Sequence, residues 1–599
     1  MIYHNDIFSF IKEQETAYKQ PIPLPGNWNW SMNDHIETTY LYANSQLKTG
    51  KNDYKPVKNI TRPILNLQHR TEDLEVKDIQ IYVDDSEKYH LSFLVKKYHD
   101  DVFVVENDLD TFLDELNVER IDYGGGLSKA VKDGREVVPM QSIAFCDQTD
   151  MLSGPIGIRH YFSPDQLLEM ASVGWGDPAN GATHSLEETI LLSREEKEKD
   201  GTVTKTPGRY IEVREVHGNL PKRFADPTYT GMDYETRIFI VCFYSTKDSE
   251  EEKGIILYTK PEPKSPFKLI KRDPVYGRAL GFGGAEELFE PQVWINYDMI
   301  RMQNMLDAAA VTILKSSDPT IAAKHPSGLK NLKNLEVLDV AAGSDLAQVD
   351  TFPRNINLFE KSVAEWEAHA QRMGAANDSI MGESPSAGTP FKLQELVTAE
   401  SHGLHEYRRG IYAKHVEELY RDDFIPRIQK KITEGTKFLS ELSLEEMNYV
   451  VDKIVANQTN RMMVEKTLNG ELVTEEEKAF FEEKIRDDFK KKGNKHFIEI
   501  LKGEFKRVPL AVKVSVAGKS KNLSRHTDKL VNVFRQVISN PAVLKIPAMA
   551  EIFNNILESS GLDPVDFSGM TQEELQAAQP AQLPPQQVAQ PSPLEQITA

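Results

Sequence analysis

Two narrow apolar stripes in the middle of the chain predict a pair of long helices. From Pro291 to Ser317 there is no further proline and no glycine, and the apolar residues recur at alternating spacings of four and three. This spacing places them on one face of a helix of about 27 residues, roughly 40 Å long at 1.5 Å per residue. A second segment has the same heptad spacing. The stripe positions are Ile295, Met299, Met302, Leu306, Ala309 and Ile313 in the first segment and Phe359, Val363, Trp366, Ala370 and Met373 in the second.

Local signals indicate where these two helices begin and end. Asp318-Pro319 is expected to end the first helix, because the residue before a proline is driven out of helical geometry. Asn357 is expected to cap the second helix, with Glu360 three residues later as in a capping box. Between the two helices lies a polar, glycine-containing interval, in which "LEVLDV" suggests a strand.

A third helix is predicted after a short interruption, "GESPSAGTPFKLQ". Thr389 is a natural N-cap, and Pro390 occupies the first helical position, where its missing N–H costs nothing. Pro426 is expected to end or kink this helix. The interruption therefore precedes a defined helix start and is a feature of the fold. The apolar side of the third helix consists of Leu393, Val397, Leu404, Tyr407 and Ile411.

The first half of the chain alternates strand-like and helix-like segments. "RYIEVREV", "TRIFIVCFYS" and "KGIILYTK" are rich in β-branched and aromatic residues and predict an antiparallel sheet. "NITRPILNLQHRTEDL", "DLDTFLDELNVERI" and "SLEETILL" predict helices. Near the end, "VPLAVKVSVAG" alternates as a half-buried strand, and "SRHTDKLVNVFRQVIS" and "IPAMAEIFNNILESS" are amphipathic. The fold class is therefore α+β, followed by a Gln- and Pro-rich tail that is expected to be disordered.

Composition narrows the possible functions. The 599 residues leave room for about four domain-sized units. The net charge of −21 disfavours a simple tight DNA binder, because phosphate neutralisation needs clustered Lys and Arg, but it is compatible with DNA sliding past. Cys146 and Cys242 form no CxxC or Cys/His cluster, so we expect neither a disulfide framework nor structural zinc, and the chain fits a reducing cytoplasm. No signal peptide or membrane span is evident.

No segment predicts a catalytic constellation, a metal site or a cofactor site. The Gly-rich "YGGGLSK" and "GRALGFGGAEE" lack the Gly-Lys-Ser/Thr of a P-loop, which favours turns or close backbone packing. His402, His405 and Glu406 share a helix face and could ligate a metal, but a solvated polar face is favoured. "VTEEEKAFFEEKIRDDFKKKGNK" suits an exposed helix surface better than a two-metal nuclease. Trp28 and Trp30 could stack on bases, although anchoring of the N-terminal segment, on the body or on a neighbouring subunit, is favoured.

The order of these features resembles the portal proteins of tailed bacteriophages, of the podovirus type. In that family a Gly-rich turn and "EEL" open one stem helix. A clip module, a second stem helix and a small tunnel loop before a long helix then follow. Here the Gly-rich turn is at 281–284, and Glu286, Glu287 and Leu288 form the "EEL". "KNITRPILNLQHRTEDL" is similar to the N-terminal wing segment of the family, and the resemblance spans residues 59–562.

The resemblance implies an α+β, portal-like subunit. It would contain a wing, a two-helix stem, a small α/β clip, a long helix after the tunnel loop and a short helical crown, without a long C-terminal barrel. The implied boundaries are 1–289 for the N-terminal part of the wing, 290–318 for stem helix 1, 319–353 for the clip, 354–382 for stem helix 2, 383–392 for the tunnel loop, 393–432 for the long wing helix, 433–520 for the C-terminal part of the wing, 521–570 for the crown and 571–599 for the disordered tail.

The resemblance also implies residue roles. In the tunnel loop, small residues allow movement and prolines limit bending, with Lys392 the cation nearest DNA and Glu383 the nearest repelling charge. The loop residues are Glu383, Ser384, Pro385, Ser386, Ala387, Gly388, Thr389 and Lys392. A basic start to the clip would suit an acidic partner or the DNA backbone, and a solvated loop explains it equally well. These clip residues are Lys324, Lys330 and Lys333. Stem packing is assigned to Ile295, Met299, Met302, Leu306, Ile313, Phe359, Val363 and Trp366.

The implied function is a ring, usually of twelve copies, at one capsid vertex of a virion, assembled in the host cytoplasm. Double-stranded DNA would be packaged and ejected through it. Terminase, tail or adaptor proteins and the major capsid protein are the implied partners, with no membrane, no cofactor and no enzyme activity. Twelve such acidic copies would carry roughly 250 negative charges, which would keep DNA from adhering to the wall. Two other classes stay open: an ATPase or nuclease of the packaging motor, which the missing phosphate loop disfavours, and a monomeric scaffold or head-tail adaptor, which the interrupted helix pair disfavours.

Overall fold

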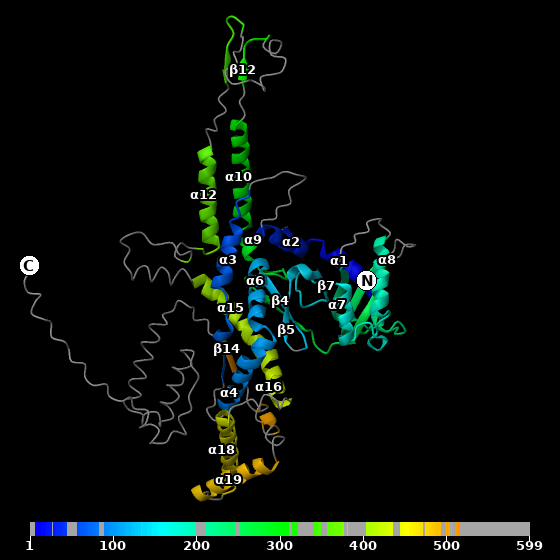
Figure 1. Ribbon diagram of the computed structural model, residues 1–599, viewed down its shortest axis with the longest axis vertical. Coiled ribbons are helices and arrows are strands. Elements are labelled where there is room, and N and C mark those ends of the chain that lie inside the picture. The colour runs from blue at the N-terminus through cyan, green and yellow to red at the C-terminus, as the bar shows by residue number, and fades with distance from the viewer. Residues whose placement is uncertain are drawn as a thin grey trace, which may run out of the picture. The chain divides into compact units, whose positions relative to one another are not determined.

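The chain divides into two compact units in a computed structural model (Figure 1). Unit 1 comprises Met1–Val76 and Val102–Val416, and unit 2 comprises Lys77–Asp101 and Glu417–Ala599. Helices and several sheets occur together, which confirms the predicted α+β class. The structure describes residues 6–26, 28–44, 57–82, 89–132, 134–198, 210–245, 252–310, 314–320, 341–348, 356–376, 380, 403–434, 444–470, 474–492, 499, 501–503, 505 and 511–514.

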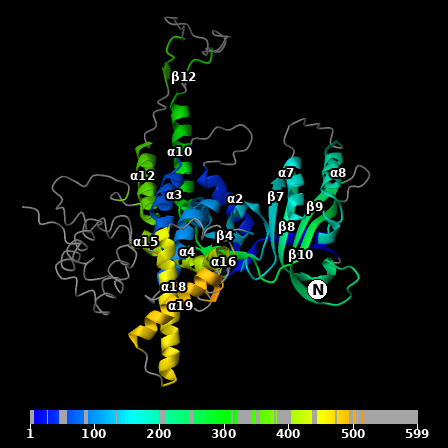
Figure 2. The ribbon, with the colours of Figure 1, turned by 60° about the horizontal axis from the view of Figure 1, so that its bottom comes forward.

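A five-stranded antiparallel sheet forms one part of unit 1, in the order β10-β9-β8-β7-β6. Its three long strands coincide with the three segments predicted as a sheet, and their alternating apolar residues form a core with α7 and α8. Both views show these two helices beside the sheet (Figures 1 and 2). The elements are β6 (Ile143–Phe145), β7 (Ile156–Phe162), α7 (Pro164–Glu169), α8 (Leu186–Glu198), β8 (Ile211–Pro221), β9 (Tyr234–Ser245) and β10 (Glu252–Pro261).

A three-stranded antiparallel sheet, in the order β11-β4-β5, lies next to the larger one. The largest apolar core of unit 1 joins the two sheets to α1 and α2 through residues such as Ile11, Leu127 and Phe145. The elements are α1 (Ile7–Tyr18), the hairpin of β1 (Ile22–Leu24) and β2 (Trp28–Trp30), α2 (Met32–Ala43), α3 (Thr61–Thr71), α5 (Val104–Glu106), α6 (Leu109–Tyr123), β4 (Gly125–Ala130), β5 (Arg135–Val138) and β11 (Phe267–Lys271). The predicted helices at α3 and α6 are confirmed.

Helices form at both apolar stripes, the proposed stem helices, but both are shorter than the sequence suggests. After the short α9 (Gly284–Glu287), α10 runs from Phe289 to Ala310 and does not reach Ser317. Leu314–Ser316 is instead strand β12, which pairs antiparallel with β13 (Leu346–Gln348). Pairing with a distant segment therefore overrides the helical stripe.

The second stem helix, α12, spans Ile356–Met373. Asn357 lies inside its first turn, so the prediction that this residue caps the helix is wrong. The helix also ends well before residue 382, because Ala375 adopts a left-handed backbone (φ 51°). The N–H of Ala376 then bonds to the carbonyl of Gln371, which satisfies part of the helix end.

The helix after the interruption continues beyond Pro426, which therefore does not end it. α15 (Gly403–Leu419) passes into a π-helical turn at Tyr420–Phe424 and then into α16 (Ile425–Glu434). Pro426 has no N–H for the carbonyl four residues earlier, and the wider π turn directly before it accommodates the missing bond. The start predicted at Thr389 and Pro390 lies outside the described residues.

Unit 2 pairs two segments that are far apart in the sequence. β3 (Ile79–Tyr82) and β14 (Ala511–Val514) form an antiparallel ladder, and β14 coincides with the strand predicted there. His99 Nε2 lies 2.7 Å from the Tyr420 hydroxyl, which joins the π turn η3 (His99–Phe103) to the one before Pro426. The helices are α4 (Tyr89–Tyr98), α16, α18 (Leu444–Leu468) and α19 (Glu475–Lys492), and the last is largely exposed, as its mixed charges predicted. The predicted crown and tail lie outside the described residues.

Candidate functional site

α10 and α12 are the two helices that the family resemblance assigns to the stem, and we call them the stem pair. α10 and α12 lie side by side in both views, with β12 beyond the end of α10 (Figures 1 and 2). Trp294 stacks on Trp366, with ring centroids 6.2 Å apart, and four residues later Asp298 accepts a 2.7 Å hydrogen bond from the Ser362 hydroxyl. From the first contact to the second, the residue number rises in α10 and falls in α12, so the two helices are antiparallel.

The predicted stripe is buried at the base of the stem and exposed farther along. Ile295 and Val363 are buried in a core with α3, and Met299, Met302 and Trp366 pack against it. Phe359 is half-buried, whereas Leu306 is 46% exposed. Ile313 lies outside the described residues. Within the described chain the stripe is therefore packed at the base of α10 and α12 and exposed at Leu306.

A glutamine of α10 fixes the stem to α3. The side-chain oxygen of Gln292 accepts hydrogen bonds from the backbone N–H groups of Ile60 (2.9 Å) and Thr61 (3.2 Å), at the first turn of α3. Its amide nitrogen donates to the carbonyl of Lys58 at 2.8 Å. The side chain thus satisfies N–H groups that a helix start leaves without intrahelical partners. The base of the stem is tied to the body by hydrogen bonds as well as by apolar packing.

The two Gly-rich stretches pack against each other below the stem. Gly124 has a left-handed backbone (φ 80°), and its carbonyl accepts hydrogen bonds from the N–H groups of Gly281 (3.1 Å) and Arg272 (3.0 Å). A Cβ atom on Gly283 would lie 2.8 Å from the nitrogen of Gly124. The prediction of close backbone packing is confirmed. This junction lies directly before α9 and α10 and sets where the stem begins.

A buried carboxylate, Glu72, lies at the centre of an ion cluster in the same region. It accepts hydrogen bonds from Arg120 Nη2 (2.8 Å) and Arg272 Nη2 (3.3 Å), and its Oε1 lies 3.2 Å from His405 Nδ1. Both guanidinium side chains are fully buried, and His405 is 1% exposed. Burial alone would raise the pKa of the Glu72 carboxyl, but the hydrogen bond with His405 and the charges of Arg120 and Arg272 hold this pKa well below its usual range. Glu72 is therefore ionised.

Arg408 extends this cluster from α15 toward the start of the stem. Its Nη2 lies 2.8 Å from Asp273 Oδ2 and 3.4 Å from Glu287 Oε1, and Glu287 belongs to the "EEL" that precedes α10. His405 Nε2 lies 3.2 Å from the carbonyl of Ala375, just beyond α12. We call the set of Glu72, Arg120, Arg272, Asp273, Glu287, His405 and Arg408 the Glu72 cluster. It joins α3, α6, α9 and α15 with the end of α12.

Sequence reasoning missed this cluster. The solvated polar face expected around His405 is wrong, because the ring is buried against Glu72, whereas His402 lies outside the described residues. The buried side of α15 carries His405, Arg408, Tyr412 and His415, spaced three or four residues apart. That spacing was visible in the sequence, but charged residues at helical spacing normally indicate a solvated face. Here the charged side of the helix is buried, because it meets charged partners from four segments that are distant in the sequence.

The tunnel-loop and clip residues lie outside the described residues. The first set falls within 381–402 and the second within 321–340, so their roles stay predictions. The described part of the interval between the stem helices is the β12–β13 hairpin. Among the described residues, no group of His, Cys, Asp and Glu is arranged to hold a metal ion, and no helix has the length and apolar character needed to cross a membrane.

A second ion network joins the two sheets of unit 1. Glu215 accepts from Lys129 Nζ (2.8 Å) and contacts His160 Nε2 (2.7 Å) and His217 Nε2 (2.9 Å). The other nitrogen of His217 lies 2.8 Å from Glu262. Both neighbours of this ring are carboxylates, so both ring nitrogens must carry hydrogen. Burial lowers the pKa of His217, but the hydrogen bonds with Glu215 and Glu262 outweigh it and raise that pKa above its usual value.

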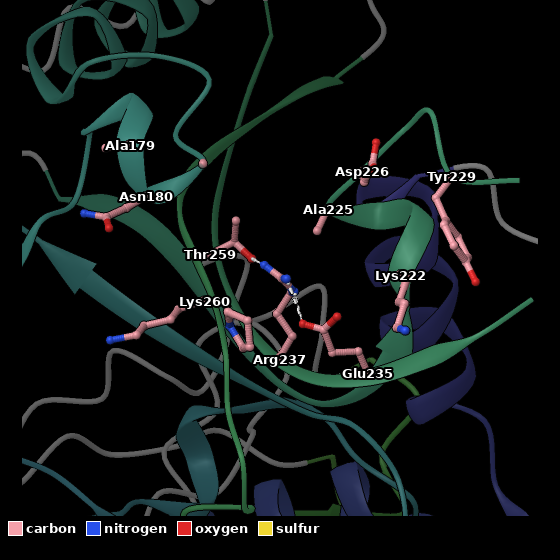
Figure 3. A pocket seen from close by; sticks show the side chains of 12 residues that line it. Ala179, Asn180, Lys222, Ala225, Asp226, Tyr229, Glu235, Arg237, Thr259 and Lys260 are labelled. Atoms are coloured by element: carbon pink, nitrogen blue, oxygen red, sulfur yellow. Dashed lines mark hydrogen bonds and ion pairs between the residues drawn. The ribbon is translucent and has the colours of Figure 1, made fainter. Parts of the chain in front are cut away.

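A surface hollow of about 530 Å³ lies at one end of the five-stranded sheet (Figure 3). Arg237 forms part of its floor, and Glu235 (2.7 Å) and Thr259 (3.3 Å) hold the guanidinium in place. Lys222 and Asp226 line the opposite wall. Because acidic and basic groups alternate and the central arginine is already paired, the hollow indicates no ligand class.

The two tryptophans of the β1–β2 hairpin differ in their environments. Trp30 packs against the main core, and the guanidinium of Arg278 lies 4.7 Å from the centre of its ring. Trp28 is 72% exposed. The favoured prediction, that these residues anchor the N-terminal segment, is confirmed for Trp30.

No protein-family model matches the sequence, and no curated protein matches it. Three solved chains show a distant similarity. A chain from the neck of an empty gene transfer agent (GTA) particle, computed with C6 symmetry, is 10% identical, with a TM-score of 0.28 over 77% of this chain and 95% of that chain. A chain from the neck of a native GTA particle, computed with C12 symmetry, is 9% identical, with a TM-score of 0.29 over 77% and 95%. A chain from the virion of a native GTA particle is 10% identical, with a TM-score of 0.27 over 79% and 98%. TM-scores of this size do not show a shared fold.

Proposed function

We propose that this chain is the subunit of a portal ring, through which double-stranded DNA enters and leaves a phage-like particle. The observation that carries the proposal is the antiparallel stem, α10 and α12, whose stripe is buried at the base and exposed at Leu306. In an isolated subunit such exposure is unfavourable by roughly 25 cal/mol per Å² of apolar surface. Packing of stems against one another in a ring would remove it.

The remaining features fit the same function. The Gly-rich junction and the Glu72 cluster hold the stem base and α15 in one arrangement, so the segment between α12 and α15 would be anchored at both ends. That segment contains the proposed tunnel loop, Glu383 to Lys392. The net charge of −21 per copy would repel DNA along the wall. In this proposal the protein is not an enzyme, and a separate terminase supplies ATP hydrolysis.

The proposed partners follow from the ring. Terminase and then tail or adaptor proteins would dock on the clip, where Lys324, Lys330 and Lys333 lie, and the major capsid protein would surround the ring in the virion. Twelve copies is the number that the family resemblance suggests.

Electron microscopy of the purified chain tests the proposal. Wild-type protein should form closed rings with a central channel and should not hydrolyse ATP. Leu306→Asp should leave the subunit folded, because this side chain is 46% exposed in the single chain, but should abolish rings by burying a carboxylate in an apolar seam. Monomers in the wild-type images would favour an adaptor or scaffold, and ATP hydrolysis would favour a motor component.

A further inference from the structure

The first half of α15 is inverted relative to an ordinary amphipathic helix. Its charged side, with His405 and Arg408, is buried in the Glu72 cluster. Three apolar residues in this part of the helix are instead uncovered: Leu404 is 41% exposed, Tyr407 is 65% exposed, and Ile411 is half-buried. These three residues are three and four positions apart and therefore share one face. Farther along α15, Tyr412, Val416 and Leu419 are buried as in an ordinary amphipathic helix. We call Leu404, Tyr407 and Ile411 the α15 stripe.

A second exposed apolar surface lies where α2 meets the base of α10. The rings of Tyr42 and Phe289 are 4.8 Å apart, and those of Trp294 and Tyr297 are 6.2 Å apart. Phe289, Trp294 and Tyr297 all lie in the first half of α10, so both ring pairs occupy the same end of this helix. Phe289, Trp294 and Tyr297 are 39%, 41% and 54% exposed. We call these four residues the aromatic patch, and Trp and Tyr dominate the energetics of protein interfaces.

The two surfaces face different directions within unit 1. In both views α2 lies to the right of α3, whereas α15 lies below it (Figures 1 and 2). Each surface also carries an exposed charge: Glu290 adjoins Phe289 in the aromatic patch, and Lys414 follows Ile411 along the exposed side of α15. Within the described part of the chain, neither charge forms an ion pair. One molecule thus presents an aromatic patch with a carboxylate on one side and an apolar stripe with an ammonium group on another.

Two different, complementary surfaces on one molecule are what a head-to-tail ring contact requires. We propose that the aromatic patch of one copy packs on the α15 stripe of the next copy, with Glu290 paired to Lys414 across the contact. The inference rests on the proposed function, because it supplies the contact that would close the ring. The contact would also press α15 onto the Glu72 cluster and so connect neighbouring copies through the helix that follows the proposed tunnel loop.

Charge reversal tests the contact directly. Glu290→Lys and Lys414→Glu should each raise the dissociation constant of one subunit–subunit contact about tenfold, because a favourable charge pair becomes a repulsive one. The double variant should restore assembly, because the pair is rebuilt with exchanged signs. Sedimentation velocity gives the assembly state. The matched control is the double variant Glu187→Lys, Lys260→Glu. Both of these residues are exposed and lie in the part of unit 1 that contains the five-stranded sheet, away from the proposed contact. The control should therefore assemble like wild type.

Tyr407→Ser provides the apolar counterpart. This substitution should leave the melting temperature of dissociated subunits unchanged, because the Tyr407 side chain is mostly exposed in the single subunit. It should weaken the assembly of subunits into rings. If wild type forms rings and neither charge reversal changes them, this contact is wrong while the portal proposal stands. If wild type forms no rings, both are wrong. If Tyr407→Ser lowers the melting temperature of the subunit without changing assembly, part of the same chain covers the stripe, which also overturns the contact.

Discussion

Replacement of Glu72 by Gln should strongly destabilise unit 1, because this carboxylate is the counter-charge of two fully buried guanidinium groups. Arg120 would keep a 2.7 Å hydrogen bond to the Asn117 amide oxygen, and Arg272 would keep Glu287 at 3.7 Å. Neither contact replaces the carboxylate at the centre of the cluster. Removing one partner of a buried ion pair typically costs about 3–5 kcal/mol. That is a large share of the roughly 5–15 kcal/mol that stabilises an ordinary domain.

The assay is hydrogen exchange of the backbone amides of α15, followed by mass spectrometry, beside a thermal melt. Glu72→Gln should accelerate exchange in residues 403–416, where His405 and Arg408 lose part of their attachment, and should lower the melting temperature. Glu187→Gln, which changes an exposed carboxylate of α8, is the control and should behave like wild type. A stability loss below about 1 kcal/mol for Glu72→Gln would show that the cluster does not hold α15.

The pH dependence of this difference has a definite sign. The pKa of Glu72 in the folded protein is depressed from its ordinary value of 4.5. The stability that its ionised form contributes is therefore fully present above about pH 4.5 and is lost as the pH falls through the folded pKa. The gap in melting temperature between wild type and Glu72→Gln should be constant near neutral pH and should narrow on acidification. A gap that widens in acid would contradict the assignment of a charged Glu72.

Four further outcomes are expected. Because the pKa of His217 is raised in the folded state, its contribution is fully present below about pH 6.5 and is lost as the pH rises through the folded pKa; wild type should lose stability over that range, and His217→Gln should lose this dependence in thermal melts. Gly124→Ala should cost about 1–3 kcal/mol in denaturant titrations, since it strains a left-handed backbone and meets Gly281, whereas an exposed Ala substitution at Glu187 should cost almost nothing. Deletion of 571–599 should leave ring number and melting temperature unchanged; a loss of several degrees would show that this segment packs somewhere. Deletion of 385–388 should leave rings intact and reduce the DNA that particles retain, and full-length genomes held as in wild type would exclude the loop from the DNA path.

Local sequence was enough to predict those elements whose apolar pattern matches the face that is buried in the fold. The strands at β8, β9 and β10 carry alternating β-branched and aromatic residues, and the same alternation packs them on α7 and α8. The heptad stripes located α10 and α12, because an apolar stripe on a long helix marks the face that will be buried, and at the base these faces pack on each other and on α3. The Gly-rich stretches likewise suggested close backbone packing before their partner was known.

What the sequence could not determine depends on partners distant along the chain. The first of the two helices ends before Leu314 rather than at Ser317, because β13, about thirty residues farther along the chain, pairs with Leu314–Ser316. The first half of α15 turns its charged side inward because three carboxylates, each from a different segment, meet His405 and Arg408 there: Glu72, Asp273 and Glu287. Helical spacing reports which residues share a face but not which face meets the body. Only the tertiary structure brings together enough opposite charge to make burial of the polar face favourable, and it thereby leaves the apolar stripe exposed.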